Sequence, residues 1–91
     1  MAPKALRTFS GHSDVVLSAR LSPDGRLVAT VGKDRTVRLW DAGTSKEVDK
    51  LDLSWCDDAP RCLAFAPDGR TLVIGTDHGV VLCVELTAGQ K

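Results

Sequence analysis

Residues 67–70 repeat the Pro-Asp-Gly-Arg of residues 23–26 without change, 44 positions further along a chain of 91 residues. The same shift pairs Ser10 with Ser54 and Asp14 with Asp58. Self-similarity at a fixed period indicates one supersecondary unit that occurs more than once, with neighbouring units stacking to cover each other's apolar faces. The chain is therefore interpreted as two copies of one small unit, each of which depends on its neighbours.

Both copies divide into short apolar or alternating segments separated by turn residues, which is the pattern of β-strands. The Pro-Asp-Gly stretches are tight turns, because proline presets φ, aspartate bonds the local backbone and glycine accepts a positive φ. Residues 15–21 are apolar nearly throughout, so we expect this strand to be buried on both faces. Strands are expected at residues 6–9, then 15–21, 27–31, 36–41 and 47–53, and finally 61–65, 71–76 and 80–86.

The first copy carries three motifs in a fixed order: Gly11-His12, Lys33-Asp34-Arg35 and Trp40-Asp41. On these motifs the chain resembles the WD-repeat family, in which about 40–45 residues make one propeller blade. The resemblance implies an all-β fold of two blades of four-stranded antiparallel sheets, part of a larger propeller or of one closed by oligomerisation. Residues 10–53 are then the first blade and residues 54–91 a degenerate second blade without its outer strand. Residues 1–9 are an outer strand for a neighbouring blade.

The resemblance also implies a chain of side-chain hydrogen bonds that braces the first blade. A buried tryptophan needs an acceptor for its N–H group, and a buried carboxylate needs donors. Such a network fixes the loops at one end of a blade when every member is satisfied. The residues that match the family's pattern are His12, Thr30, Asp34 and Trp40.

The second blade departs from that pattern at all four positions. The 44-residue shift places Cys56, Ile74, His78 and Val84 there. We therefore expect the second blade to be held together by apolar packing without polar bracing. Its expected core consists of Phe65, Leu72, Ile74, Val81 and Val84.

A second likeness concerns residues 57–60, 65–69 and 73–79, which resemble atypical blades of the echinoderm microtubule-associated-protein-like family. In that family a regular blade precedes a degenerate one, as it does here. The likeness implies a microtubule-associated propeller fragment as one alternative function.

The composition excludes several classes of protein. Twelve basic and twelve acidic residues give no net charge, so bulk charge attracts neither nucleic acid nor a membrane surface. No apolar run approaches the roughly 18 residues of a membrane span, and the N-terminus has no apolar signal core. Three cysteines without Cys-x-x-Cys spacing indicate neither a disulfide framework nor a zinc site. We expect a cytoplasmic protein, with association with the cytoskeleton as an alternative, and no metal and no cofactor.

Catalytic and metal-binding interpretations of these residues are weaker than structural ones. A nucleophilic triad would need Cys56 with a histidine and an aspartate, but His12 has a structural role in the family and His78 lies in a turn. A metal site at Cys56, Asp57, Asp58 and His78 would mix soft and hard ligands without a ligand spacing. The basic residues Lys33, Arg35 and Arg38 fit a solvated surface. Trp55 either packs beneath its loop or is an exposed anchor, and we expect packing.

The expected function is that of a non-enzymatic scaffold that binds protein or peptide partners through loops at one end of the blades. A different class of function is a self-assembling unit, in which three or four chains form a closed propeller. It follows from the apolar flanks that an isolated pair of blades leaves in water. The candidate partner-binding residues are Ser13, Asp14, Lys33 and Arg35 from the first blade and Asp57, Asp58 and His78 from the second.

Overall fold

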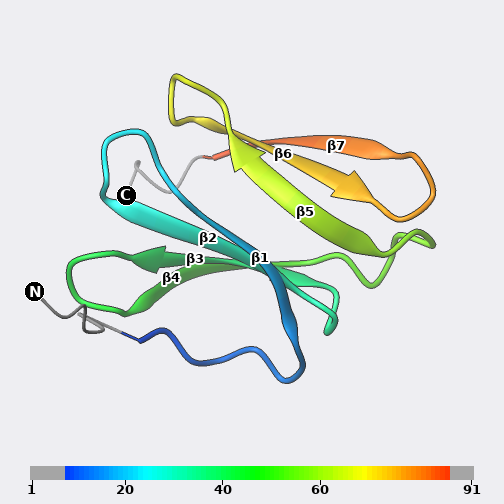
Figure 1. Ribbon diagram of the computed structural model, residues 1–91, viewed down its shortest axis with the longest axis horizontal. Coiled ribbons are helices and arrows are strands. Elements are labelled where there is room, and N and C mark those ends of the chain that lie inside the picture. Colours follow the sequence, from blue (N-terminus) through cyan, green and yellow to red (C-terminus); the bar gives the residue numbers. More distant parts are fainter. Residues whose placement is uncertain (1–7, 87–91) are drawn as a thin grey trace, which may run out of the picture.

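The computed structural model describes residues 8–86 and folds into two antiparallel β-sheets (Figure 1). The first sheet is a meander in the order β1-β2-β3-β4, and the second has the order β5-β6-β7. The all-β prediction is confirmed, and residues 8–86 contain no helix of the length and hydrophobicity that a membrane span needs. The strands are β1 (Val16–Leu21), β2 (Leu27–Gly32), β3 (Thr36–Asp41), β4 (Glu47–Asp52), β5 (Pro60–Phe65), β6 (Thr71–Thr76) and β7 (Val81–Glu85).

The repeated Pro-Asp-Gly-Arg residues form the first turn of each sheet. Asp24 accepts hydrogen bonds from the Ser22 hydroxyl at 2.7 Å and from the Arg26 amide at 3.0 Å. Asp68 accepts the matching bond from the Arg70 amide at 2.8 Å. The glycine of each turn has a φ near +70°, +78° in the first and +71° in the second, which side chains disfavour. The repeat is therefore explained by turn geometry.

The 44-residue period extends to the pairing register of the strands. Ala19 lies opposite Thr30 in the first sheet, and Leu63 lies opposite Ile74 in the second. Each sheet also has an irregularity at the start of its first strand, between Val16 and Ser18 and between Pro60 and Cys62. The two sheets are thus copies of one unit in backbone as well as in sequence.

The core lies between the two sheets, which pack face to face. Alternate side chains of β2 and β3 point toward the second sheet, and alternate side chains of β5 and β6 point back. Burying one such aliphatic side chain stabilises the fold by about 1.5–3 kcal/mol. The buried cluster consists of Ala29, Val31, Val37, Leu39 and Leu53 from the first half and Leu63, Leu72 and Ile74 from the second.

The expectation that residues 15–21 are buried on both faces is wrong. Leu21 is 60% exposed, and Val15 and Val16 are also largely exposed. The sheet order explains this, because β1 is an edge strand with β2 on one side and no described strand on the other. The apolar composition of residues 15–21 predicted a strand, but it did not predict which other strands lie beside it.

The second sheet also turns an apolar face to solvent. Val81, expected in the core, is 62% exposed, because its side chain and that of Cys83 point away from the first sheet. Leu72 and Ile74 are buried as expected, while Phe65 and Val84 are partly buried. We call this surface the outer face of the second sheet; its uncharged part consists of Cys62, Ala64, Val73, Gly75, Val81 and Cys83, and Thr71 and Glu85 continue the same face at one end.

The strand predicted at residues 6–9 lies partly outside the described residues. Thr8 and Phe9 are described and are not in a strand. The role of residues 1–9 as an outer strand for a neighbouring blade stays a prediction.

Candidate functional site

A chain of hydrogen bonds runs through the outer side of the first sheet. The Trp40 indole N–H donates to the Thr30 hydroxyl at 2.9 Å, and the same oxygen lies 2.6 Å from His12 Nε2. His12 Nδ1 lies 3.0 Å from the Asp34 carboxylate. With its proton on Nδ1, His12 donates to Asp34 and accepts from the Thr30 hydroxyl, whose oxygen in turn accepts from Trp40. The structure thus brings together the four residues that the family resemblance indicated.

Asp34 accepts more hydrogen bonds than any other residue in this network. Besides His12, it accepts hydrogen bonds from the Ser13 amide at 3.0 Å, the Thr36 amide at 3.1 Å and the Thr36 hydroxyl at 2.8 Å. Burial alone would raise the pKa of this carboxyl, but the hydrogen bonds from Ser13, Thr36 and His12 outweigh it and hold the pKa well below its usual 3.8. Asp34 therefore stays ionised and ties the segment before β1 to the β2–β3 turn.

Two glycines let these side chains approach the backbone. A Cβ at Gly32 would come within 2.8 Å of His12 Nδ1 and 2.9 Å of Asp34 Oδ1. A Cβ at Gly11 would meet the Trp40 ring at 2.9 Å. The Phe9 ring packs edge-on against Trp40 at a centroid distance of 5.7 Å. Residues 9–12 therefore cover part of the first sheet's outer side.

The expectation that the second blade lacks polar bracing is wrong. Asp58, 9% exposed, accepts a hydrogen bond from the Thr76 hydroxyl at 2.6 Å and from the His78 amide at 3.0 Å. His78 Nδ1 lies 2.9 Å from the same carboxylate. The Thr76 and His78 hydrogen bonds lower the pKa of Asp58, although burial acts in the opposite direction. The second blade has a His–Asp pair with the two residue types exchanged between loop and turn.

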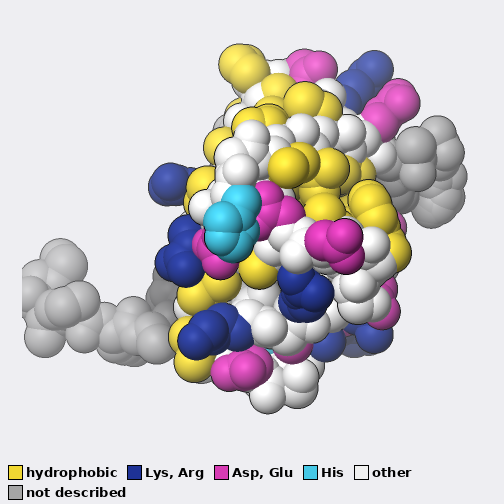
Figure 2. Space-filling view, turned by 90° about the vertical axis from the view of Figure 1, so that its right-hand side faces the viewer, with side chains coloured by type: hydrophobic (Ala, Val, Ile, Leu, Met, Phe, Trp, Pro, Cys, Tyr) yellow, Lys and Arg dark blue, Asp and Glu magenta, His cyan; other side chains and the backbone are white. Residues whose placement is uncertain are grey.

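Both polar networks lie at one end of the molecule, which we call the loop end: residues 10–15, 33–35, 53–59 and 77–80. Figure 1 shows these connections at the right, and Figure 2 looks directly onto them. In Figure 2 basic, acidic and hydrophobic side chains are interspersed around a histidine. Of the candidate partner-binding residues, Asp58 is buried and bonded within its blade, and Arg35 is partly buried. The exposed candidates are Ser13, Asp14, Lys33, Asp57 and His78.

Arg35 connects the two halves of the loop end through hydrogen bonds. Its guanidinium donates to the Asp57 carbonyl at 3.2 Å, and its own carbonyl accepts from the Leu53 amide at 2.9 Å. Its φ of +67° lies in the left-handed region, where the corresponding residue of the second sheet is Gly79 with φ +98°. Arg35 thus adopts a backbone conformation that favours glycine, and its side chain contacts the loop between the sheets.

Trp55 lies in the loop end and Arg61 near the start of β5, and neither was among the partner-binding residues predicted from the sequence. Trp55 is 69% exposed, so the expectation that it packs beneath its loop is wrong. Arg61 forms an ion pair with Asp77 and helps line a pocket of about 100 Å³ together with Lys33 and Arg35. The residues next to Trp55 in the sequence gave no signal of its exposure. Arg38, expected beside Lys33, instead pairs with Glu47 at 2.9 Å.

Metal-ligating side chains do not cluster in the described part of the chain. Within residues 8–86, no three His, Cys, Asp or Glu side chains are grouped so that they could hold an ion. Cys62 and Cys83 are exposed free thiols, and Cys56 is a partly buried free thiol. The loop end therefore presents exposed side chains on a backbone that hydrogen bonds hold in place.

Two stacked antiparallel meanders, with loops gathered at one end, define a segment of a β-propeller. The chain belongs to the WD40 family, described as "WD domain, G-beta repeat", whose profile matches residues 3–41 and 49–83. The family prediction made from the sequence motifs is confirmed. The closer likeness to the echinoderm microtubule-associated-protein-like family stays a prediction.

Several curated relatives share this sequence pattern. The small ribosomal subunit protein RACK1z of Arabidopsis thaliana is 35% identical over 77 residues, which are 85% of this chain and 23% of that protein. The nuclear distribution protein PAC1 of Arthroderma benhamiae is 40% identical over 62 residues, 68% of this chain and 13% of that protein. The ribosome biogenesis protein BOP1 homolog of Drosophila virilis is 28% identical over 84 residues, 91% of this chain and 10% of that protein.

Solved structures show the same fold. The structure of U3-55K matches with a TM-score of 0.81 at 19% identity, over 90% of this chain and 26% of that one. The crystal structure of the RRP9 WD40 repeats matches with the same TM-score and coverage. The chain thus spans about a quarter or less of the length of these proteins.

These comparisons correct the expected localisation. A cytoplasmic protein with a possible cytoskeletal association was expected, but the relatives include small ribosomal subunit proteins and ribosome biogenesis proteins. That expectation is therefore wrong. The expectation of no nucleic-acid partner also has no support, because the relatives include a protein of the small ribosomal subunit and the ribosome contains RNA.

Proposed function

We propose that this chain is a non-enzymatic module that binds protein partners through its loop end. The observation that carries the proposal is the exposure of Trp55 on a loop held at both of its ends. Leu53 is bonded to Arg35, and Asp58 is bonded to Thr76 and His78. A rigidly mounted aromatic side chain binds at low entropic cost, and tryptophan is enriched among residues that dominate binding energy.

The charges around Trp55 add specificity to this surface. Lys33 presents an exposed ammonium group, and Asp14 and Asp57 present exposed carboxylates. Such interspersed charges steer association and reject mismatched partners more than they add affinity. We therefore propose that the affinity of this surface comes from Trp55 and its selectivity from the charges.

The test is a binding screen against purified ribosomal and ribosome-assembly proteins, a set chosen because the relatives' names favour it. For the tightest partner, Trp55→Ala is expected to weaken binding at least about 10-fold, the loss typical of a central aromatic anchor. Lys33→Ala is expected to reduce the association rate about 2–5-fold at low salt, with a smaller effect at high salt. Surface plasmon resonance measures both quantities.

Two control variants lie away from the loop end. Lys46→Ala removes an exposed lysine from the β3–β4 turn at the opposite end, and Val48→Ala trims an exposed apolar side chain on β4. Both are expected to leave affinity unchanged. The proposal fails if Trp55→Ala and Lys33→Ala behave like these controls for every partner. It also fails for the ribosomal set if no member of that set binds.

A second candidate function is head-to-tail self-assembly of this chain into a closed ring. The observation that favours it is the outer face of the second sheet, where six neighbouring residues carry no charge and include the exposed Val81, with Glu85 at one end of the face. Monomeric proteins seldom leave a continuous apolar sheet face in water. Three or four two-blade chains would complete a ring of six or eight blades.

Light scattering on the 91-residue chain tests this candidate. We expect a single species of three or four chains, each of 9.7 kDa. Val81→Lys is expected to reduce the mass to that of one chain, because it places a charge in the contact face. Val48→Lys on β4 is the control for added charge at an exposed valine. A mass of one chain at every concentration, or a continuous spread of masses, contradicts self-assembly.

A further inference from the structure

A pocket of about 100 Å³ lies beside the loop end, where the turn between β2 and β3 meets the start of β5. Three cationic side chains line it, Lys33 and Arg35 from the first sheet and Arg61 from the second. Asp77 is the one carboxylate in its wall, so positive charge exceeds negative charge there. Part of the remaining wall is apolar and includes Pro60, and apolar surroundings strengthen the attraction between opposite charges. Such a pocket favours a negatively charged ligand.

The three cations keep hydrogen-bond donors for such a ligand. Arg35 donates one N–H to the carbonyl of Asp57, which is a neutral group and does not balance its charge. Arg61 uses Nε for its ion pair with Asp77, and its guanidinium makes no other hydrogen bond within residues 8–86. Lys33 is exposed and forms no ion pair with any described residue. A guanidinium carries five N–H donors in a fork that matches the oxygens of a carboxylate or a phosphate.

The charges of the pocket are not part of the repeated blade framework. A shift by 44 residues replaces the cation of Lys33 by the opposite charge of Asp77. The same shift replaces Arg35 by Gly79. Arg35 has a φ of +67°, in a region that glycine adopts more readily than any residue with a side chain. A side chain that is retained in a disfavoured backbone conformation indicates that the side chain has a role.

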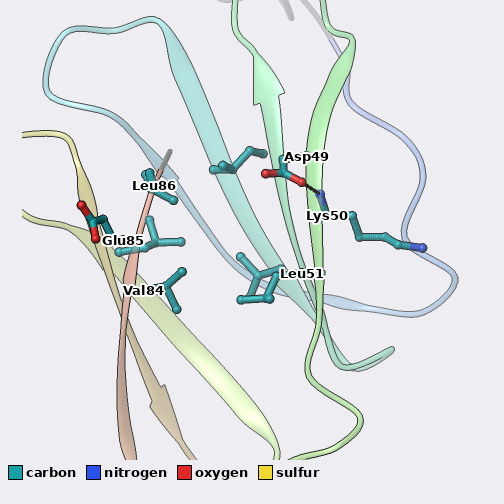
Figure 3. A pocket seen from close by; sticks show the side chains of 9 residues that line it. Asp49, Lys50, Leu51, Val84, Glu85 and Leu86 are labelled. Atoms are coloured by element: carbon teal, nitrogen blue, oxygen red, sulfur yellow. Dashed lines mark hydrogen bonds between the residues drawn. The ribbon is translucent and has the colours of Figure 1, made fainter. Parts of the chain in front are cut away.

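The larger groove between β4 and β7 has the opposite charge balance. Its volume is about 210 Å³, and Figure 3 shows Leu51 and Val84 facing each other across it. Two carboxylates, those of Asp49 and Glu85, line this groove together with the single ammonium group of Lys50. Negative charge exceeds positive charge there, so a negatively charged ligand is attracted to the smaller pocket and not to the groove.

We infer that the smaller pocket binds an acidic side chain of the partner protein, through its carboxylate or phosphate group. The inference rests on the function proposed above and adds the chemistry of the partner. One loop links the pocket to Trp55, because the same loop bonds to Arg35 through the Asp57 carbonyl and lines the pocket with Ala59. The partner segment that fits this surface therefore contains an acidic side chain for the pocket and an apolar one for Trp55.

The charges around the pocket favour a protein segment over a nucleic acid. Asp14, Asp57 and Asp77 are exposed acidic residues of the loop end, and Figure 2 shows acidic and basic side chains interspersed there. A nucleic-acid backbone is bound along a continuous basic surface that neutralises several phosphates. Exposed carboxylates interrupt such a surface, whereas a single acidic side chain needs only the pocket.

An NMR titration of the isotopically labelled 91-residue chain tests the pocket with defined probes. The probes are the blocked tripeptides Gly-Glu-Gly, Gly-phosphoserine-Gly and Gly-Gln-Gly. We expect the two acidic peptides to shift the amide signals of Lys33, Arg35 and Arg61 to saturation. The uncharged peptide is expected to bind at least about 10-fold more weakly. The tighter of the two acidic peptides identifies the source of the charged group, and equal binding of all three peptides overturns the inference.

Single substitutions test whether the peptides bind in the pocket. Arg61→Gln and Lys33→Gln each remove one charge and are expected to weaken binding of the tighter acidic peptide about 3–5-fold. Arg70→Gln removes the same charge from the exposed β5–β6 turn at the opposite end and is expected to leave the affinity unchanged. Circular dichroism verifies that each variant is folded. Equal affinities of the two pocket variants and the control overturn the inference.

Two outcomes separate this inference from the proposed function. If Trp55→Ala weakens binding of a protein partner and Arg61→Gln does not, the proposed function stands and the acidic contact is overturned. If the tripeptides bind in the pocket and Trp55→Ala behaves like its controls for every partner, the proposed function fails, and the assignment to a partner's side chain fails with it.

A further comparison tests the choice of a protein over a nucleic acid. The probes are a ten-residue glutamate peptide and a ten-nucleotide oligouridylate, which carry similar charge. The peptide is expected to bind at least as tightly as the oligonucleotide. An oligonucleotide that binds about 10-fold more tightly, and that loses affinity in Arg61→Gln, assigns the pocket to a nucleic acid and overturns the inference.

Discussion

Trp40→Ala is expected to lower the free energy of unfolding by about 3–5 kcal/mol, the usual cost of removing a large buried aromatic side chain. Trp40 is 2% exposed, donates its indole N–H to Thr30 and carries the Phe9 ring on its edge. Its removal leaves a cavity and frees the segment that Phe9 anchors. Since a small domain has only about 5–15 kcal/mol of stability, much of the variant is expected to be unfolded. Urea titration followed by circular dichroism measures the change.

Two control variants isolate the cause of this loss. Trp40→Phe keeps most of the apolar volume and removes only the N–H donor, so its expected cost is about 1–2 kcal/mol. Trp55→Ala removes an exposed tryptophan and is expected to change stability by less than about 0.5 kcal/mol. A Trp40→Ala variant that is no less stable than Trp55→Ala would show that the outer side of the first sheet is not packed as described.

Asp34→Asn is expected to cost about 2–3 kcal/mol at neutral pH. The carboxylate accepts hydrogen bonds from Ser13, Thr36 and His12, and bonds to a charged acceptor are worth about 1.5–3 kcal/mol. An amide is a weaker acceptor, and its NH₂ group meets donors where it needs an acceptor. Asp14→Asn, at an exposed position one residue from Ser13, is the matched control and is expected to be near neutral. Equal stability of the two variants would contradict the described role of Asp34.

The same carboxyl predicts how stability depends on pH. The pKa of Asp34 is lower in the folded chain than its unfolded value of 3.8. Between these two values the unfolded chain binds more protons, so stability rises with pH. The contribution is therefore complete above about pH 5 and is lost as the pH falls below 3.8 toward the folded value. Asp34→Asn is expected to flatten this part of the profile, and a profile as steep as that of the unmodified chain would contradict the assignment.

The sequence predicted the first blade well because its signals are local. The Pro-Asp-Gly turns depend on residues two positions apart, and the structure contains them where the repeat indicated. His12, Thr30, Asp34 and Trp40 come from motifs whose spacing is set by strand and turn lengths. The strand bounds differ from the predicted ones by a residue or two, as the ends of pairing depend on neighbouring strands.

Burial was less predictable because it depends on what lies beside each strand. Leu21 and Val81 occur in apolar segments, yet both side chains are exposed at an edge or on the outer face of a sheet. A strand that is apolar on both sides indicates that something covers it in the assembled protein. In residues 8–86 nothing covers those sides, which is why the apolar composition and the exposure disagree.

The second blade shows a different limit of sequence reasoning. Its bracing was not predicted because the family pattern places His and Asp at the positions that they have in the first blade. Asp58 and His78 form the same kind of pair with the residue types exchanged. Asp58 and His78 match a looser pattern, which requires only an acidic residue before the first strand of a sheet and a hydrogen-bond donor in the turn between its second and third strands. The exposure of Trp55, by contrast, depends on the path of a loop that no local pattern specifies.

The central claim is that the two sheets stack through one apolar core, so that the loops of both blades share one end. Methyl–methyl nuclear Overhauser contacts in the chain with labelled valine, leucine and isoleucine test this claim directly. We expect contacts from Val31, Val37 and Leu39 of the first sheet to Leu63, Leu72 and Ile74 of the second. Contacts confined within each sheet, with none between the two groups, would contradict it.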